Sequence, residues 1–276
     1  MSTTQRERAA EAWDGVAAGY DEVVTPMILP LAEEALDRVG LRPGLRLLDV
    51  AAGTGALSIP AARLGAQVVA TDISPAMIER LQARARAEGL ANVEGRVMDA
   101  HALEFDDDTF DVVASQAGVS LIPDLGLGLR EMVRAAKPGG RVLVVAFGPP
   151  QRAEFLGFFL AALKATVPGF TGPPSDPPPP QFQVADPGTF SKRLVEAGLK
   201  DVSVEPLTFG MTFRSAKHLW DLVLSSNPMG RALIADVTDG QRAEARRVLD
   251  GMLRERSGGE AAATLNADFN IGIGTR

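Results

Sequence analysis

The sequence predicts an α/β fold, in which a doubly wound sheet of mostly parallel strands lies between two layers of helices. Five short apolar runs alternate with stretches of helical character in the first half of the chain. The runs are rich in Val, Leu and Ala without strict polar alternation, which is typical of parallel strands covered on both faces. Strands that alternate with helices form sheets with right-handed crossovers. The expected strands are residues 45–51, 67–71, 93–98, 110–115 and 141–147.

The composition fits a soluble globular protein and argues against several kinds of site. The chain has 276 residues, of which 46% are hydrophobic and 23% charged, and its formal net charge is −7. An acidic chain lacks the basic face that nucleic-acid binding requires, so we expect no nucleic-acid partner. There is no cysteine, and the only histidines and tyrosine are His101, His218 and Tyr20. We therefore expect no disulfide, no cysteine nucleophile and no metal.

The N-terminal region predicts helices and no targeting segment. Its first dozen residues are charged, and the longest apolar stretches, 142–147 and 155–163, are too short to span a bilayer. We therefore expect a cytoplasmic protein without a membrane partner. An amphipathic helix is expected over about residues 4–19, because four residues share one face at helical spacing: Trp13, Val16, Ala17 and Tyr20. A second helix is expected at residues 30–39.

Glycine and proline mark the boundaries of the next elements. Ser74 and Pro75 begin a helix that Gly89 ends, since these residue types favour helix starts and stops. Residues 137–140, Lys-Pro-Gly-Gly, predict a turn that leads into the fifth strand. These boundaries place the helices between the strands, as the alternating fold requires.

The second half of the chain differs in character. A helix at 151–167 is apolar around most of its circumference, and it is followed by a loop with seven of the chain's 19 prolines: Pro168, Pro173, Pro174, Pro177, Pro178, Pro179 and Pro180. Asp186-Pro187 starts a helix that Gly198 ends. The remaining expected elements are a strand that includes Val202, Val204 and Leu207, two helices at 215–225 and 239–256, and a last strand at 267–274.

Polar and small residues follow each of the first four expected strands. In an open α/β sheet, ligands bind at the carboxyl ends of the strands, near the point where strand order reverses. The first strand leads into a loop with Gly53 and Gly55, whose backbone can turn tightly and approach a ligand. Asp72 follows the second strand, Asp99 the third and Gln116 the fourth. A carboxylate at Asp72 suits both hydroxyls of a ribose, so these residues predict a nucleoside-bearing ligand.

Two nucleoside ligands fit this pattern. A dinucleotide site favours Gly or Ala at the position that Ser58 occupies, three residues after Gly55. This mismatch disfavours a nicotinamide cofactor, and so does the presence of one tyrosine only, Tyr20, outside any Tyr-x-x-x-Lys pair. The other candidate is S-adenosylmethionine, whose amino-acid end sits against a glycine-rich loop that binds no phosphate.

Four segments in order resemble the class I S-adenosylmethionine-dependent methyltransferases, and most closely the ubiquinone/menaquinone-biosynthesis type. They are Leu-Asp-Val-Ala-Ala-Gly-Thr-Gly at 48–55, Ala-Thr-Asp-Ile-Ser-Pro-Ala-Met at 70–77, Phe-Asp-Val-Val at 110–113 and Ala-Lys-Pro-Gly-Gly at 136–140. The clear similarity covers about residues 39–147. Family members commonly have Gly where this chain has Ala51, a change that narrows the pocket. The resemblance implies a seven-stranded Rossmann-like sheet with an antiparallel last strand, N-terminal helices and a helical lid.

The resemblance also implies roles for individual residues in binding S-adenosylmethionine. Gly53 and Gly55 would line the methionine end, and Asp72 would hold the ribose hydroxyls. Further roles follow for the adenine, the transferred methyl and the cover: Ile73, Asp99 and Ala100 at the adenine, Gln116 beside the methyl, and Trp13 and Tyr20 over the cofactor. In the domain organisation that we expect, one domain of 1–276 comprises a helical cover (1–44), a cofactor-binding core (45–150), a lid and acceptor region (151–185 and 212–260) and the end of the sheet (186–211 and 261–276).

The residues that would serve the acceptor are less determined. His101 is a candidate base or a capping residue, and His218 is a candidate base, a substrate contact or a packing residue. Phe155 and Phe159 line an apolar acceptor pocket or pack the lid onto the core, and Trp220 belongs to the same lid region. The expected reaction is methyl transfer to an oxygen, nitrogen or carbon atom of a small, largely apolar metabolite. The rival functions are an NAD(P)-dependent oxidoreductase and a cofactor-retaining protein that does not methylate.

Overall fold

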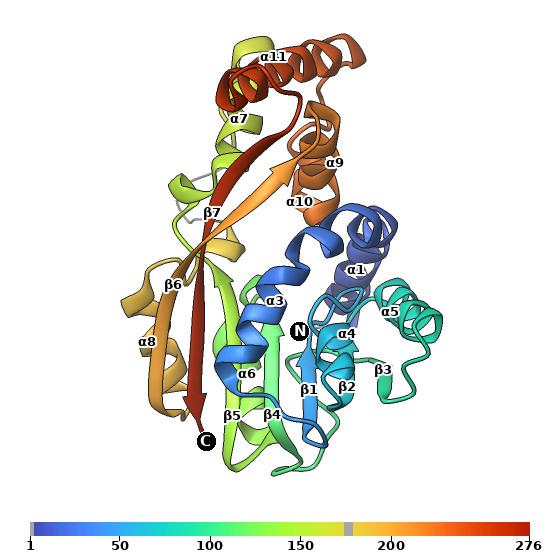
Figure 1. The fold of residues 1–276 in the computed structure, drawn as a ribbon, viewed down its shortest axis with the longest axis vertical. Coiled ribbons are helices and arrows are strands. Elements are labelled where there is room, and N and C mark those ends of the chain that lie inside the picture. The colour runs from blue at the N-terminus through green and yellow to red at the C-terminus, as the bar shows by residue number, and fades with distance from the viewer. Residues whose placement is uncertain (1–2, 174–178) are drawn as a thin grey trace.

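The computed structural model describes residues 3–173 and 179–276, and it contains one seven-stranded sheet (Figure 1). The strand order is β3-β2-β1-β4-β5-β7-β6, and β7 alone runs antiparallel to its neighbours. This confirms the predicted fold class. The bounds of the strands are β1 Arg46–Val50, β2 Gln67–Asp72, β3 Val93–Val97, β4 Phe110–Gln116, β5 Ala136–Phe147, β6 Lys200–Phe213 and β7 Ala263–Thr275.

The strand order reverses between β1 and β4. From β1 the chain proceeds outward to β2 and β3, and then returns to pair β4 with the other side of β1. Leu48 of β1 therefore lies between Val69 of β2 and Val113 of β4. In such a sheet the helices that follow the strands diverge at this point and leave a crevice at the carboxyl ends.

Helices cover both faces of the sheet. One face packs with α3 and α4, and its core continues into α7, α9 and α11. The other face packs with α6 and α8. The bounds are α1 Thr3–Asp14, α2 Ala17–Gly19, η1 Tyr20–Val24, α3 Thr25–Val39, α4 Ser58–Arg63, α5 Pro75–Ala87, η2 Val119–Leu121, α6 Leu125–Ala135, η3 Pro150–Arg152, α7 Glu154–Thr166, η4 Pro180–Phe182, α8 Pro187–Glu196, α9 Ala216–Ser226, α10 Pro228–Ala232 and α11 Asp239–Ser257.

The N-terminal helices are arranged differently from the prediction. The helix expected at 4–19 ends at Asp14, and a short α2 leads into η1, a π-helical segment. The next helix, α3, begins at Thr25, five residues before the expected start, and contains Pro30 in its interior. Proline is tolerated there because the helix loses only one hydrogen bond, while seven residues of α3 are buried against the core.

The second half of the molecule holds the larger departures. Strands β6 and β7 pair from Lys200 and Thr275 up to Phe213 and Ala263, so both are much longer than expected. The ends at Phe213 of β6 and Ala263 of β7 extend past the other strands and reach α7, α9 and α11, which lie together there (Figure 1). The sequence did not predict α10. The predicted turn at 137–140 lies inside β5, where the register with β4 shifts. Part of the proline-rich loop, including Pro174, Pro177 and Pro178, lies outside the described residues.

Several predicted helix boundaries are confirmed. The Ser74 side chain accepts a hydrogen bond from the Met77 N–H and begins α5, and Asp186 does the same for the Thr189 N–H at the start of α8. Such caps satisfy N–H groups that have no partner within a helix. Among the described helices, none is long and apolar enough to cross a bilayer.

Candidate active site

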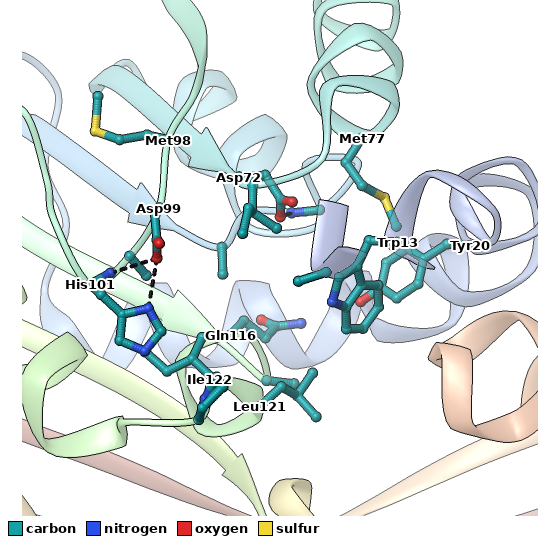
Figure 2. Close-up of a pocket in the computed structure, with 18 residues that line it drawn as sticks. Trp13, Tyr20, Asp72, Met77, Met98, Asp99, His101, Gln116, Leu121 and Ile122 are labelled. Atoms are coloured by element: carbon teal, nitrogen blue, oxygen red, sulfur yellow. Dashed lines mark hydrogen bonds and ion pairs between the residues drawn. The ribbon is translucent and has the colours of Figure 1, made fainter. Parts of the chain in front are cut away.

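A pocket lies where the strand order reverses, at the carboxyl ends of β1, β2, β3 and β4 (Figure 2). Eight of the nine residues that the sequence predicted for cofactor binding line it, and we call it the cofactor pocket. It is lined by Ala9, Trp13, Tyr20, Ala51, Gly53, Asp72, Ile73, Met77, Met98, Asp99, Ala100, His101, Gln116, Ala117, Gly118, Leu121, Ile122 and Pro123.

Asp72, the last residue of β2, is held rigidly at the edge of this pocket. One carboxylate oxygen accepts the Gly53 N–H and the other accepts the Ser74 N–H, both at 2.9 Å. Burial raises the pKa of Asp72 to about 6, although these N–H donors favour the charged form. The carboxylate thus joins the loop after β1 to the start of α5, and each oxygen retains a lone pair for a ligand hydroxyl.

Asp49 of β1 is a polar residue that the sequence analysis did not single out as a site residue. Its side chain is buried, and Oδ2 accepts a hydrogen bond from the Ser58 hydroxyl at 2.6 Å. Within the described residues, Oδ1 has no hydrogen-bond partner. Burial, together with the charge of Asp72, raises the pKa of Asp49 to about 7, although the hydrogen bond from Ser58 favours the charged form. An unpaired buried carboxylate oxygen is costly and favours a donor or cation nearby.

The loop after β1 follows a backbone path that few residue types accept. Gly53 and Gly55 have φ values of +55° and +93°, and Ala51 has a φ of +55°. Gly55 does not line the pocket, because it faces Leu81 and Ile59, where a Cβ would lie 3.0 and 3.2 Å from their side-chain atoms. Its role is therefore the tight turn onto α4.

The backbone conformation of Ala51, with a φ of +55°, explains why glycine is favoured at this position. A left-handed conformation brings its Cβ close to its own backbone, which strains a residue other than glycine. The segment that contains Gly118 packs against this methyl group and leaves room for it, since a Cβ on Gly118 would lie 2.6 Å from the Ala51 Cβ. The two residues therefore fit as a pair at the floor of the pocket.

His101 connects the Asp99 carboxylate to the backbone at Asp124, on the opposite wall of the pocket. The Asp124 N–H donates to His101 Nε2 at 3.3 Å, so the proton of the neutral ring is on Nδ1, which donates to Asp99 at 2.7 Å (Figure 2). Burial raises the pKa of Asp99, but the hydrogen bonds from His101 outweigh it and the net shift is downward. Both nitrogens of this buried imidazole are thus engaged within the protein.

The N-terminal segment covers the pocket and is held to α5 by hydrogen bonds and an ion pair. Trp13 and Tyr20 both line the pocket from this segment. Asp14 accepts hydrogen bonds from the Ser74 hydroxyl and, at 3.1 Å, from the Ala76 N–H, and Asp21 pairs with Arg84 at 3.0 Å. Burial raises the pKa of Tyr20, so its phenol stays protonated at neutral pH. The cover therefore closes the pocket with aromatic rings.

A second pocket, which we call the acceptor pocket, shares a wall with the first. Four residues line both pockets: Tyr20, Gln116, Ala117 and Leu121. The other residues of the acceptor pocket are mostly apolar and come from η1, α3, α7, η4, α9, α10, the end of β5, the middle of β7 and the segments next to these elements. They are Val24, Ile28, Leu31, Phe147, Phe155, Leu156, Pro173, Pro179, Gln181, Phe182, Val223, Ser226, Asn227, Met229, Gly230, Leu233 and Phe269.

The predicted acceptor residues divide between this pocket and the core of the lid. Phe155 lines the acceptor pocket, whereas Phe159 is fully buried and packs on Trp220 with ring centroids 5.0 Å apart. His218 lies at the start of α9, where its Nδ1 accepts the Arg214 N–H at 3.3 Å. Neither Phe159, Trp220 nor His218 lines either pocket. The sequence could not separate these residues, because an apolar helix buries several of its faces at once.

The cofactor pocket has the polar groups that S-adenosylmethionine requires. Asp72 and Asp99 line the pocket with carboxylates, which fit hydroxyl and amine groups. Asp49 does not line the pocket, but its buried carboxylate has an unpaired oxygen and interacts with the charge of Asp72. Gly53 N–H is taken by Asp72, which agrees with a loop that binds no phosphate. The residues present therefore fit this cofactor.

Comparisons with known proteins identify the family of the chain. A family model described as a methyltransferase domain matches residues 47–140. An uncharacterized protein of Mycobacterium tuberculosis is 38% identical over 158 residues, which cover 56% of this chain and 56% of that protein, so the match spans about half of that relative. The demethylmenaquinone methyltransferase of Mycolicibacterium gilvum is 33% identical over 215 residues, 73% of this chain and 90% of the relative.

A solved structure shows the same fold. A putative methyltransferase from Bacillus halodurans matches with a TM-score of 0.58 at 19% identity, covering 88% of this chain and 97% of that one. The match to the Mycolicibacterium enzyme covers 73% of this chain and is therefore longer than the segment 47–140 that the family model matches. The chain belongs to the class I S-adenosylmethionine-dependent methyltransferases.

Proposed function

We propose that this protein transfers the methyl group of S-adenosylmethionine to a small, largely apolar acceptor. The observation that carries this proposal is the pair of pockets that meet at Tyr20, Gln116, Ala117 and Leu121. When bound, the cofactor supplies a methyl group on a positively charged sulfur. A shared wall is what methyl transfer requires, because the protein must align the acceptor with the methyl group and exclude water.

In the proposed complex the polar residues hold the nucleoside. Asp72 accepts the ribose hydroxyls, Asp99 accepts the adenine amine, and Ile73 and Ala100 pack against the base. Gly53 lets the backbone approach the amino-acid end, and Asp49 balances its ammonium group. Trp13 and Tyr20 cover the pocket against water.

The residues around the acceptor act by alignment, and the proton that a neutral acceptor loses on methylation passes to solvent. The apolar walls of α3 and α7 keep water out, which favours a transition state that loses positive charge. We propose that His101 positions Asp99 and the wall at Asp124, since both of its ring nitrogens are engaged. His218, away from both pockets, serves the start of α9.

The domain organisation follows from the same proposal. Residues 1–44 cover the cofactor and 45–150 bind it, whereas 151–185 and 212–260 select the acceptor. Residues 186–211 and 261–276 complete the sheet. A relative of this chain is named a demethylmenaquinone methyltransferase, and the four phenylalanines of the acceptor pocket (Phe147, Phe155, Phe182 and Phe269) suit a fused aromatic ring of that kind.

Calorimetric titration tests the proposal. S-adenosylhomocysteine should bind with a dissociation constant far below that of NADH, and labelled S-adenosylmethionine should pass its methyl group to reduced demethylmenaquinone or to another apolar metabolite of a bacterial extract. Tighter binding of NADH would overturn the choice of cofactor. Tight cofactor binding without labelling of any metabolite would favour a protein that does not methylate.

A further inference from the structure

The acceptor pocket contains no charged side chain among the residues that line it in the described part of the chain. Five polar side chains face it: Tyr20, Gln116, Gln181, Ser226 and Asn227. The Ser226 hydroxyl donates to the Val223 carbonyl at 3.1 Å, and the Asn227 carbonyl oxygen accepts the Gly230 N–H at 3.1 Å. These two side chains are thus used to build the local structure, and the polar contacts available to an acceptor come from the others.

Gln116 is oriented by a backbone contact from another element. Its side chain is buried, with the residue 7% exposed, and Nε2 donates to the Ile28 carbonyl of α3 at 3.2 Å. An amide turned the other way would place two acceptor oxygens against each other, so the contact identifies the remaining atom as Oε1. Within the described residues, Oε1 of Gln116 has no hydrogen-bond partner, and neither has Oε1 of Gln181.

The unpaired Oε1 of Gln116 can accept a hydrogen bond from a donor group of the ligand. A buried hydrogen-bond acceptor without a partner destabilises the protein, so a ligand that donates a hydrogen bond to it gains affinity. Gln116 belongs to the wall that both pockets share, beside Tyr20 and Leu121 (Figure 2). A donor that meets its oxygen from the acceptor side therefore lies next to the site of methyl transfer.

We propose that Gln116 is a specificity-determining residue, whose Oε1 accepts a hydrogen bond from a hydroxyl or N–H group of a neutral acceptor. This inference rests on the proposed function and adds the chemical class of the acceptor to it. Gln181 supplies a second acceptor oxygen for a molecule with two such groups. Carboxylate and phosphate acceptors are disfavoured, because none of the described residues that line the pocket offers a counter-charge and desolvation of an unpaired anion is costly.

Binding of three small probes tests this inference without knowledge of the natural acceptor. The protein is saturated with S-adenosylhomocysteine, and the dissociation constants of 1-naphthol, naphthalene and 1-naphthoate are measured by equilibrium dialysis. We expect 1-naphthol to bind about tenfold more tightly than naphthalene, the equivalent of one hydrogen bond, and 1-naphthoate to bind more weakly than both.

Two variants locate the preference. In Gln116→Met, a change of similar size and shape without the amide, the preference for 1-naphthol over naphthalene should fall to less than about twofold. The matched control is Gln183→Met, because the Gln183 amide bonds to the Ser120 carbonyl and lines neither pocket, and it should keep the preference.

The outcomes are distinct. Equal binding of 1-naphthol and naphthalene to the wild-type protein, or tight binding of 1-naphthoate, overturns the inference even if no variant folds. A preference that persists in Gln116→Met also overturns it and leaves the Gln116 oxygen to the cofactor. Failure of S-adenosylhomocysteine to bind the wild-type protein at all instead defeats the proposed function.

Discussion

The cofactor pocket and the acceptor pocket share a wall but have opposite electrostatic character. Asp72, Asp99 and His101 face the cofactor pocket, and the buried carboxylate of Asp49 lies behind its loop. The acceptor pocket has no charged side chain among its described residues. The first suits a ligand with an ammonium group, hydroxyls and an amine, whereas the second suits a neutral, apolar one.

The two pockets also differ in how the chain builds them. The polar groups of the cofactor pocket each follow a strand of one continuous sheet, within about half of the sequence. The acceptor pocket joins residues as distant in sequence as Val24 of η1 and Phe269 of β7. A pocket at the ends of hydrogen-bonded strands has a rigid backbone. The shape of a pocket formed by separate helices changes whenever one of those helices shifts or changes in sequence. Under the proposed function, this difference leaves cofactor binding to the first pocket and selection of the acceptor to the second.

The largest effect is expected from a substitution that removes the carboxylate of Asp72, which organises the cofactor pocket. Asp72→Ala should weaken binding of S-adenosylhomocysteine by about 1–3 kcal/mol, because ribose hydroxyls and two backbone N–H groups lose their acceptor. Calorimetric titration at neutral pH measures this. Asp106→Ala, in an exposed turn, is the control and should bind as the wild type does. Equal affinities for the two variants would mean that the ribose lies elsewhere.

The charge of the cofactor pocket predicts an unusual dependence of stability on pH. Burial raises the pKa values of Asp49 and Asp72 to about 7 and about 6, well above that of an unfolded Asp. The folded state therefore binds protons more tightly than the unfolded state, so the free energy of unfolding decreases as pH rises from 5.5 to 7.5, by about 2 kcal/mol.

Urea unfolding of the protein without cofactor checks this dependence at both pH values. Asp49→Asn keeps the size of the side chain but cannot titrate there, so its unfolding free energy should vary by less than half as much between the two pH values. A wild-type protein that is more stable at pH 7.5, or a variant with the same dependence as the wild type, would contradict the raised pKa values.

A charge placed in the acceptor pocket should abolish the contrast between the two pockets. Leu156 lines the acceptor pocket and is half-buried, and Leu156→Asp brings an unpaired carboxylate there. We expect the affinity for 1-naphthol to fall at least about tenfold at saturating S-adenosylhomocysteine. Leu156→Met, which keeps the wall apolar, should retain most of the affinity. Unchanged binding to the Asp variant would show that acceptors bind at another place.

The smallest expected effect concerns backbone strain at the floor of the cofactor pocket. Ala51 has a φ of +55°, so Ala51→Gly should raise the free energy of unfolding by about 0.5–1 kcal/mol. Ala52→Gly, one residue on and without a positive φ, is the control and should lower it by about 0.4–1 kcal/mol. Thermal unfolding of both variants measures the difference. Destabilisation of both would mean that the contact of Ala51 with Gly118 outweighs the strain.

The elements that the sequence predicted well are those with local signals. The first four strands of the core, the start of α5 at Ser74 and the start of α8 at Asp186 were predicted closely, because apolar runs and capping residues act over a few positions, whereas β5 begins five residues before its predicted start. The sequence missed α10 and the full length of β6 and β7. Much of β6 is exposed, so its pairing with β7, rather than its hydrophobicity, determines where it ends.

The same reasoning separates the site residues. Asp72, Asp99 and Gln116 were predicted because each follows a strand, and all three line the pocket. Asp49 carried no signal of its own, since its importance lies in one buried oxygen without a partner. Phe155 and Phe159 looked equivalent in the sequence, yet only Phe155 faces the acceptor pocket.

The sequence by itself determined the class of fold, the order of the core strands along the chain and the residues at their ends that line the cofactor pocket. These depend on the period of hydrophobic residues and on short motifs, which act locally. Only the tertiary structure decided which lid residues face the acceptor, how His101 joins Asp99 to Asp124, and that the Gln116 oxygen lacks a partner. These features depend on contacts between residues up to some 240 positions apart, and packing of whole elements sets them.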